Sequence, residues 1–68
     1  MRIPLDIIEV DTVFEYPINS LNKYKKGTTT RGTEIRCSPF LGGQFQTHES
    51  IEVWIPKDAE VWIDRDLK

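Results

Sequence analysis

The clearest prediction of a fold comes from residues 33–45, which read TEIRCSPFLGGQF. Up to residue 41 the side chains alternate: Ile35 and Cys37 fall on one face of an extended chain, and charged residues fall on the other. This period of two is typical of a half-buried strand. The pair Gly42-Gly43 then favours a two-residue turn, because glycine tolerates the positive φ angles that such turns need. We therefore predict a β-hairpin whose return strand opens at Phe45.

The C-terminal third of the chain contains a short repeat, because the tetrapeptide EVWI at residues 52–55 recurs at residues 60–63. A spacing of eight residues is far too short for a solenoid, so we predict the two strands of a second hairpin. If the valines and isoleucines face the core, the two tryptophans lie side by side on the opposite face. The cross-strand pairs in this register are Ile55 with Val61, Val53 with Ile63 and Trp54 with Trp62, around the loop Lys57-Asp58-Ala59.

The first half of the chain gives weaker patterns. Residues 5–16 also alternate, which predicts one strand, or two short strands bent near Asp11, ending before Pro17. The segment 20–26 starts with a serine that can cap a helix and is followed by a glycine that can end one, so it is either one short helical turn or extended. Residues 27–32 hold two glycines and no apolar side chain, which predicts a loop.

The length of the chain limits the fold. A chain of 68 residues has room for one small core, since domains of this size bury about 60% of the surface of the unfolded chain. We therefore expect one domain over residues 1–68. Short strands separated by turn signals predict an all-β or β-rich α+β fold. The expected form is a small five-stranded barrel or a strongly twisted antiparallel sheet, SH3-like or OB-like, with at most one short helical turn near residues 20–26. No motif in the sequence identifies a family.

Composition favours an intracellular protein. Hydrophobic residues make up 38% of the chain and charged residues 29%, which argues against a disordered tail, and no apolar run approaches the roughly 20 residues that span a membrane. Asp6, Glu9 and Asp11 interrupt any secretory signal. The single cysteine, Cys37, cannot form an internal disulfide, although secreted domains this small usually need several. We expect a cytoplasmic protein with a reduced cysteine and no membrane partner.

The two tryptophans are candidate partner-binding residues. In the predicted hairpin they form a paired indole surface flanked by carboxylates, and tryptophan is enriched among the residues that dominate protein interfaces. The alternative interpretation is that this face is covered, because two tryptophans are a large share of the core that so small a domain can build. The candidate partner-binding set is Trp54, Trp62, Glu52 and Glu60.

Charge is distributed unevenly along a chain whose net charge is −2. Residues 1–20 carry −3, residues 21–40 carry +4 and residues 41–68 carry −3. A basic segment can track a phosphate backbone, and a tyrosine within it can stack on a base. The acidic charge of the whole chain weighs against general nucleic-acid affinity. For this alternative, the candidate nucleic-acid contacts are Lys23, Tyr24, Lys25, Lys26, Arg31 and Arg36.

The sequence does not predict a catalytic or metal-binding site. Cys37 and His48 are the one pair that could form a nucleophile and its base, but Cys37 falls on the apolar face of its strand. One cysteine and one histidine cannot complete a four-ligand zinc site. Residues 27–33 have the glycine spacing of a phosphate loop, but Thr33 stands where a lysine is needed. Carboxylates near the C-terminus match no calcium loop and indicate a solvated acidic face. They are Asp58, Glu60, Asp64 and Asp66. We expect no catalytic residues, no metal and no cofactor.

These exclusions leave a non-enzymatic binding protein as the predicted function. A small domain without a catalytic set can act by occupying a surface of a larger macromolecular partner, as inhibitors and modulators encoded by phages and mobile elements do. We expect a protein partner or larger complex, and the alternative is a single-stranded nucleic-acid-binding β-barrel that uses the basic segment 23–36. A homodimer is a third option, because an exposed tryptophan pair or an open sheet edge can pair with itself.

Overall fold

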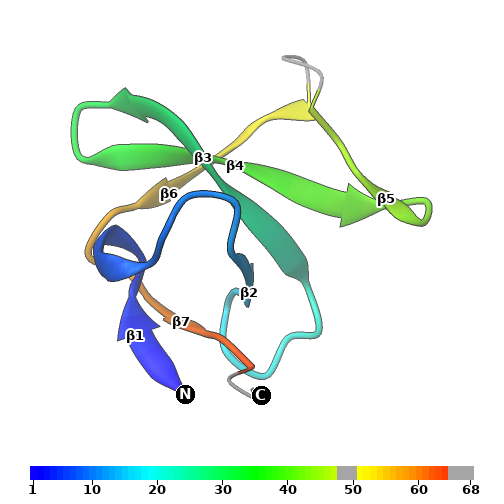
Figure 1. Ribbon diagram of the computed structural model, residues 1–68, viewed down its shortest axis with the longest axis horizontal. Coiled ribbons are helices and arrows are strands. Elements are labelled where there is room, and N and C mark those ends of the chain that lie inside the picture. Colours follow the sequence, from blue (N-terminus) through cyan, green and yellow to red (C-terminus); the bar gives the residue numbers. More distant parts are fainter. Residues whose placement is uncertain (48–50, 65–68) are drawn as a thin grey trace.

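The computed structural model describes residues 1–47 and 51–64 of the chain. In these ranges the chain forms seven strands and one 3-10 turn, and the strands belong to one antiparallel sheet (Figure 1). The elements are β1 (Arg2–Pro4), η1 (Leu5–Ile7), β2 (Val13–Glu15), β3 (Lys23–Arg31), β4 (Glu34–Leu41), β5 (Gln44–Phe45), β6 (Val53–Pro56) and β7 (Glu60–Trp62). The all-β fold class is confirmed, with seven strands in place of five. Within the described ranges, no helix is long and apolar enough to cross a membrane.

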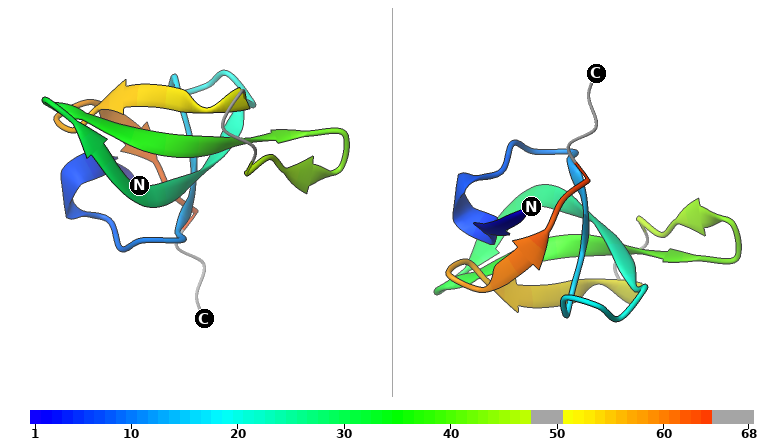
Figure 2. Two further views of the ribbon diagram at one scale, coloured as in Figure 1. Left: turned by 90° about the horizontal axis from the view of Figure 1, so that it is seen from above. Right: turned by 90° about the horizontal axis from the view of Figure 1, so that it is seen from below.

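The sheet curls around a small core. Its strand order is β1-β7-β2-β3-β4-β5, and β6 also pairs with β4. The long strands β3 and β4 twist across one side of the molecule, and β1 and β7 lie on the other side (Figures 1 and 2). The β4–β5 end of the sheet projects from this body as a two-stranded arm, residues 40–45 (Figure 1). The buried cluster inside the curl consists of Leu5, Ile8, Phe14, Ile35, Cys37, Ile55, Val61 and Ile63.

The hairpin predicted around Gly42-Gly43 is confirmed. Phe45 lies opposite Phe40 across this turn, and both glycines have positive φ angles, of 61° and 87°. Along β4, Ile35 and Cys37 point into the core, as their alternation predicted. The local turn and the period of two were enough to define this hairpin, because both features belong to neighbouring residues.

The predicted hairpin between the two EVWI segments is wrong. β6 pairs with β4, placing Ile55 opposite Ile35, whereas β7 pairs with β1, placing Val61 opposite Ile3. The faces of both strands are still as predicted, because Ile55 and Val61 are buried. After β6 the chain turns sharply, with the Ala59 N–H donating to the Pro56 carbonyl, and crosses to the other side of the core. The two strands thereby bury their apolar faces from different sides instead of from one hairpin.

The predicted strand over residues 5–16 is largely wrong. Its first part is the 3-10 turn η1, and only the short strand β2 follows. Between them the chain turns at Asp11, whose φ angle is 73°, close to the bend that the sequence predicted as an alternative. The turn leaves Val10 46% exposed, although alternation would have placed it beside the buried Phe14. The Thr12 N–H donates to the Glu9 carbonyl at 3.2 Å, and the Asp11 N–H donates to the Lys26 carbonyl at 2.9 Å, so backbone hydrogen bonds close this turn.

The segment from Lys23 to Arg31 is one strand, so the loop predicted over residues 27–32 is wrong and the helical turn is absent. Its three threonines are β-branched and fit a strand, which the glycines on either side obscured. Gly27 lies against β4, where a Cβ would come within 2.8 Å of the Arg36 carbonyl oxygen. Gly32, with a φ angle of 61°, makes the tight connection to β4. The pairing with β4 has a register shift between Lys26 and Thr30.

Candidate functional site

Trp54 is already engaged by its neighbours on the protein. The guanidinium of Arg31 lies 4.2 Å from the centre of an indole ring, and the indole N–H donates to a Glu52 carboxylate oxygen at 3.1 Å. The same carboxylate pairs with the Arg36 Nε at 3.3 Å. This network joins the tip of the β3–β4 hairpin to β6. Trp54 and Glu52 therefore connect β6 to the β3–β4 hairpin.

Trp62 lies in a different environment. It is 40% exposed on β7 and faces outward opposite Glu15 of β2. In the sheet, β2, β3 and β4 stand between β7 and β6, so the two tryptophans do not form the paired surface expected from a hairpin. Glu60 is exposed on β7 opposite Pro4 of β1. Of the predicted partner-binding set, Trp62 is the side chain with a large exposed apolar surface.

The predicted nucleic-acid residues do not form a continuous basic surface. Lys26 points inward, is 8% exposed, and donates from Nζ to the Ile8 carbonyl at 2.5 Å and the Asp6 carbonyl at 3.3 Å. Tyr24 also points inward and packs against Phe14, with ring centres 5.8 Å apart. Three of the outward cations form ion pairs with carboxylates at 3.2–3.4 Å. These pairs are Lys23 with Glu15, Arg31 with Glu34, and Arg36 with Glu52.

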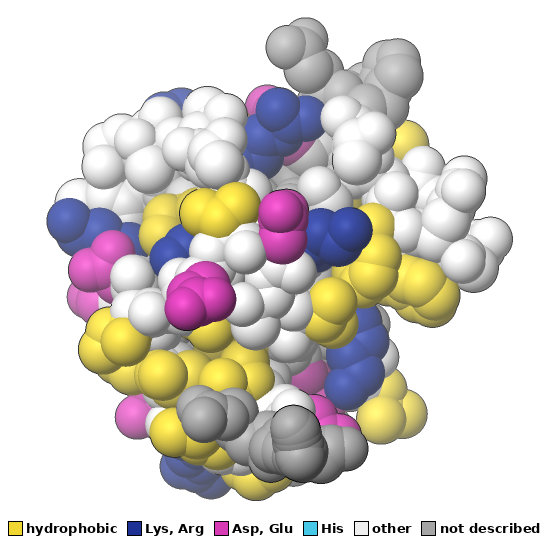
Figure 3. All heavy atoms as spheres, viewed as in Figure 1, with side chains coloured by type: hydrophobic (Ala, Val, Ile, Leu, Met, Phe, Trp, Pro, Cys, Tyr) yellow, Lys and Arg dark blue, Asp and Glu magenta, His cyan; other side chains and the backbone are white. Residues whose placement is uncertain are grey.

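A group of exposed apolar side chains, three of them aromatic or bordering aromatic rings, lies between β7 and the arm. Val13, Phe40 and Trp62 are 43%, 45% and 40% exposed, and together with Phe45 they border a hollow of about 360 Å³. Figure 3 shows hydrophobic side chains beneath the arm beside a notch in the surface, with basic side chains next to them. The hollow is lined by Val13, Phe14, Lys23, Phe40, Phe45, Trp62 and Asp64, and we call it the aromatic groove.

Strand geometry explains how the aromatic groove forms. Phe40 has the outward parity of β4, and the Gly42-Gly43 turn brings Phe45 next to it, with ring centres 4.9 Å apart in an edge-to-face arrangement. Lys25 extends over the Phe45 ring, its Nζ 4.9 Å from the ring centre. Toward the body, outward residues of β3, β2 and β7 form the other wall. The groove therefore runs across the strands, from the arm to β7.

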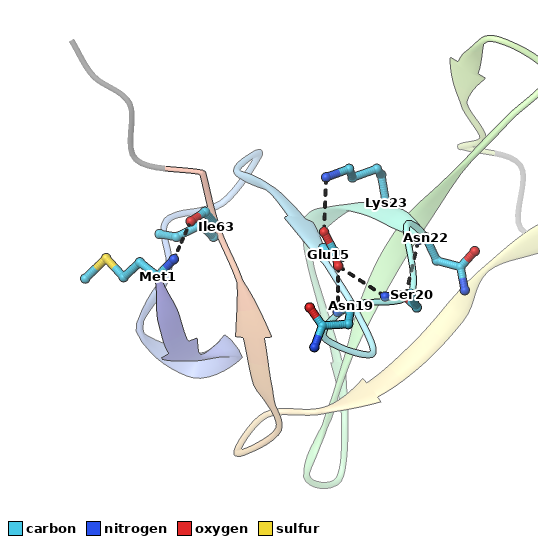
Figure 4. Close-up of polar contacts among 7 residues, drawn as sticks. All are labelled: Met1, Glu15, Asn19, Ser20, Asn22, Lys23 and Ile63. Atoms are coloured by element: carbon cyan, nitrogen blue, oxygen red, sulfur yellow. Dashed lines mark hydrogen bonds and ion pairs between the residues drawn. The ribbon is translucent and has the colours of Figure 1, made fainter.

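Glu15 fixes the wall of the groove next to Trp62. One carboxylate oxygen accepts from the backbone N–H groups of Asn19 and Ser20, at 2.7 and 3.1 Å, and the other lies 3.4 Å from the Lys23 Nζ (Figure 4). Desolvation raises the pKa of Glu15, but hydrogen bonds from the Asn19 backbone, the Lys23 side chain and the Leu21 backbone outweigh it, so the pKa is lowered overall. Glu15 is therefore ionised near neutral pH and saturated mainly by backbone donors.

The structure places Cys37 in the core. Its thiol is fully buried and lies 3.6 Å from the Ile35 carbonyl, and burial raises its pKa to about 11. A thiol with this pKa is a poor nucleophile at neutral pH. His48 and Asp66 lie outside the described residues. Among residues 1–47 and 51–64, no three His, Cys, Asp or Glu side chains gather closely enough to hold a metal ion.

Reasoning from the sequence missed most of the aromatic groove. Phe40 could have been found, because the alternation that places Ile35 and Cys37 inward gives Phe40 the outward parity. The glycine turn then predicts that Phe45 lies beside it. No local signal places Val13 or Trp62 near this pair, since they belong to strands distant in the sequence.

Comparisons with known proteins do not identify a relative. No protein-family model, no curated protein and no solved structure matches the chain. The physical character of the aromatic groove is therefore the main evidence about function.

Proposed function

We propose that this protein is a non-enzymatic binding module that docks on a protein partner through the aromatic groove. The observation that carries the proposal is the exposure of Val13, Phe40 and Trp62, each above 39%, around one hollow. Several large apolar side chains of this small domain are exposed at separate places, but these three border a single hollow together with Phe45. Exposed apolar surface that gathers in one place is typical of interaction sites. By occupying a surface of a larger partner, the domain would inhibit or modulate it.

The size and composition of the aromatic groove support this proposal. A hollow of about 360 Å³ lies at the lower end of the range for specific binding pockets, so it has room for one or two large side chains. Tryptophan and other aromatic residues at the centre of an interface contribute most of the binding energy when water is excluded from them. Trp62 and Phe40 hold these positions, on opposite walls of the groove.

Nucleic-acid binding is less well supported by the same surface. Affinity for nucleic acid comes largely from cations that displace counterions from phosphates. Arg31 and Arg36 are paired with carboxylates and Lys26 is buried, so of the candidate nucleic-acid cations Lys23 and Lys25 remain at the groove, and two cations do not make the continuous track that a phosphate backbone needs. Aromatic side chains alone provide stacking without this electrostatic attraction.

A peptide selection tests the proposal. Random peptides are selected on the wild-type domain, and the best binder is titrated by calorimetry against Phe40→Ala, Trp62→Ala and Ile7→Ala. Ile7 is 67% exposed but lies outside the groove, so it is the matched control. We expect the two groove variants to weaken binding about 30-fold or more, or 2 kcal/mol, and the control to change it less than twofold. Circular dichroism checks that each variant is folded.

Equal affinity of all three variants would contradict the proposal. So would tight binding of a labelled single-stranded oligonucleotide with a log–log salt slope near −0.7 for each phosphate contact, because this would favour the nucleic-acid alternative.

A further inference from the structure

The aromatic groove is also bordered by charged side chains, and these indicate the chemistry of the partner. This inference rests on the proposed function. We propose that the aromatic groove binds a linear protein segment in which a large apolar side chain is flanked by carboxylates. The apolar side chain enters the hollow between Trp62 and Phe40, and a carboxylate contacts the ammonium groups of Lys23 and Lys25.

The two lysines are positioned side by side along the groove. They lie two residues apart on β3, with Lys23 opposite Glu15 and Lys25 opposite Val13, so both side chains leave the same face of the sheet. Lys23 lines the hollow, and Lys25 reaches over Phe45, which lines it too. The cations therefore border the apolar surface that a partner would cover.

Both ammonium groups retain donors for a partner. Glu15 receives its shorter hydrogen bonds, 2.7 and 3.1 Å, from backbone N–H groups, whereas its contact with Lys23 is longer, at 3.4 Å. The Lys23 side chain is 43% exposed. Among the described residues, the closest charged or aromatic contact of Lys25 is the Phe45 ring, and a carboxylate is not within ion-pair distance. A partner carboxylate near these two groups would gain charge-assisted hydrogen bonds as the groove excludes water.

An anionic segment fits this surface better than a cationic one. Asp64, two residues after the end of β7, is the one carboxylate among the described lining residues, whereas two ammonium groups, those of Lys23 and Lys25, border the hollow. The two lysines belong to β3, which lies between β7 with Trp62 and β4 with Phe40. A segment that fills the hollow therefore passes next to them. A basic segment would place its charges against them, and like charges at an interface oppose binding.

Three capped hexapeptides provide the probes for the test. Each contains the same central Phe-Leu pair, flanked by two glutamates, two glutamines or two lysines on each side. Binding is followed by two-dimensional NMR of the labelled domain, which resolves the Trp62 indole N–H and detects affinities in the millimolar range. We expect the glutamate peptide to bind about five- to tenfold more tightly than the glutamine peptide, and the lysine peptide to bind most weakly. At about 1 M salt, where screening is strong, the difference should shrink to less than twofold.

A charge reversal then separates the lysines from the rest of the surface. Lys25→Glu is expected to weaken binding of the glutamate peptide about tenfold and to strengthen binding of the lysine peptide. Lys57→Glu makes the same change of net charge at an exposed position outside the groove and should alter neither affinity by more than twofold. Loss of folding would weaken both peptides, so the opposite changes cannot arise from it.

The possible failures are distinguishable. If the three peptides bind the groove equally and Phe40→Ala abolishes binding of each, the proposed function stands and the acidic partner is refuted. Tightest binding by the lysine peptide also refutes it. If no peptide shifts groove resonances but an oligothymidine does, both the acidic partner and the protein-binding function are wrong.

Discussion

Replacing Lys26 by methionine should destabilise the domain by about 2 kcal/mol, even though the two side chains have similar length. Lys26 is 8% exposed, and its ammonium donates to the Ile8 carbonyl at 2.5 Å and to the Asp6 carbonyl at 3.3 Å. These bonds connect β3 to the chain that leaves η1. Methionine preserves the apolar stem but removes both donors.

The magnitude follows from the two contacts. A hydrogen bond from a charged donor contributes about 1.5–3 kcal/mol, and the longer of the two contributes less than the short one. Methionine regains part of the loss, because it buries an apolar end in place of an ammonium group. A net cost of about 2 kcal/mol is a large share of the roughly 3–10 kcal/mol expected for a domain of this length.

Urea unfolding followed by tryptophan fluorescence measures the effect. With a slope of about 1 kcal/mol per molar urea, the midpoint should fall by about 2 M. Lys57→Met is the matched control, because Lys57 is exposed, and it should change stability by less than about 0.5 kcal/mol. If Lys26→Met and Lys57→Met have the same midpoint, the ammonium of Lys26 does not anchor this segment and the reasoning is refuted.

Two further predictions concern ionisation. Because burial raises the pKa of Cys37 from 9.0 to about 11, the unfolded chain loses this proton first, so stability should fall by about 2 kcal/mol between pH 9 and pH 11. Urea midpoints of wild type and Cys37→Ala across this range measure the fall; an equally steep decline in the variant would contradict the assignment. The pKa of Glu15 is lowered in the folded state, so its stabilising contribution is present above pH 4.5 and is lost as the pH falls through the folded value. Glu15→Gln should therefore flatten the loss of thermal stability in acid, and an unchanged acid profile would argue against the hydrogen bonds of Figure 4.

The two hairpin predictions show where sequence reasoning is reliable. The hairpin around Gly42-Gly43 is correct because its partner strand is specified by a turn of adjacent residues. The hairpin between the EVWI segments is wrong because nothing in either segment specifies its partner. A strand with one apolar face can pair with any neighbour that presents its own apolar face to the same core. The actual partners are β4 for β6 and β1 for β7.

The candidate site illustrates the same limit. The sequence drew attention to Trp62, Trp54 and the lysines, but it could not tell which cation is paired or buried. Lys25 and Lys26 are adjacent and chemically identical, yet one faces a phenylalanine ring on the surface and the other bonds to carbonyl groups inside. Their difference comes from the alternation of β3 and from what happens to lie on each side of it.

The sequence by itself determined that residues 33–41 and the two EVWI segments form strands, that a tight turn falls at Gly42-Gly43, and which face of β4, β6 and β7 is apolar. These properties arise from the geometry of a single extended chain, whose side chains alternate with a period of two. Only the tertiary structure decided how β1, β2, β6 and β7 pair, where Lys26 points, and that Trp62 borders the same hollow as Phe40 and Phe45. These properties depend on contacts between residues far apart in the chain, and such contacts are selected by the packing of the whole core.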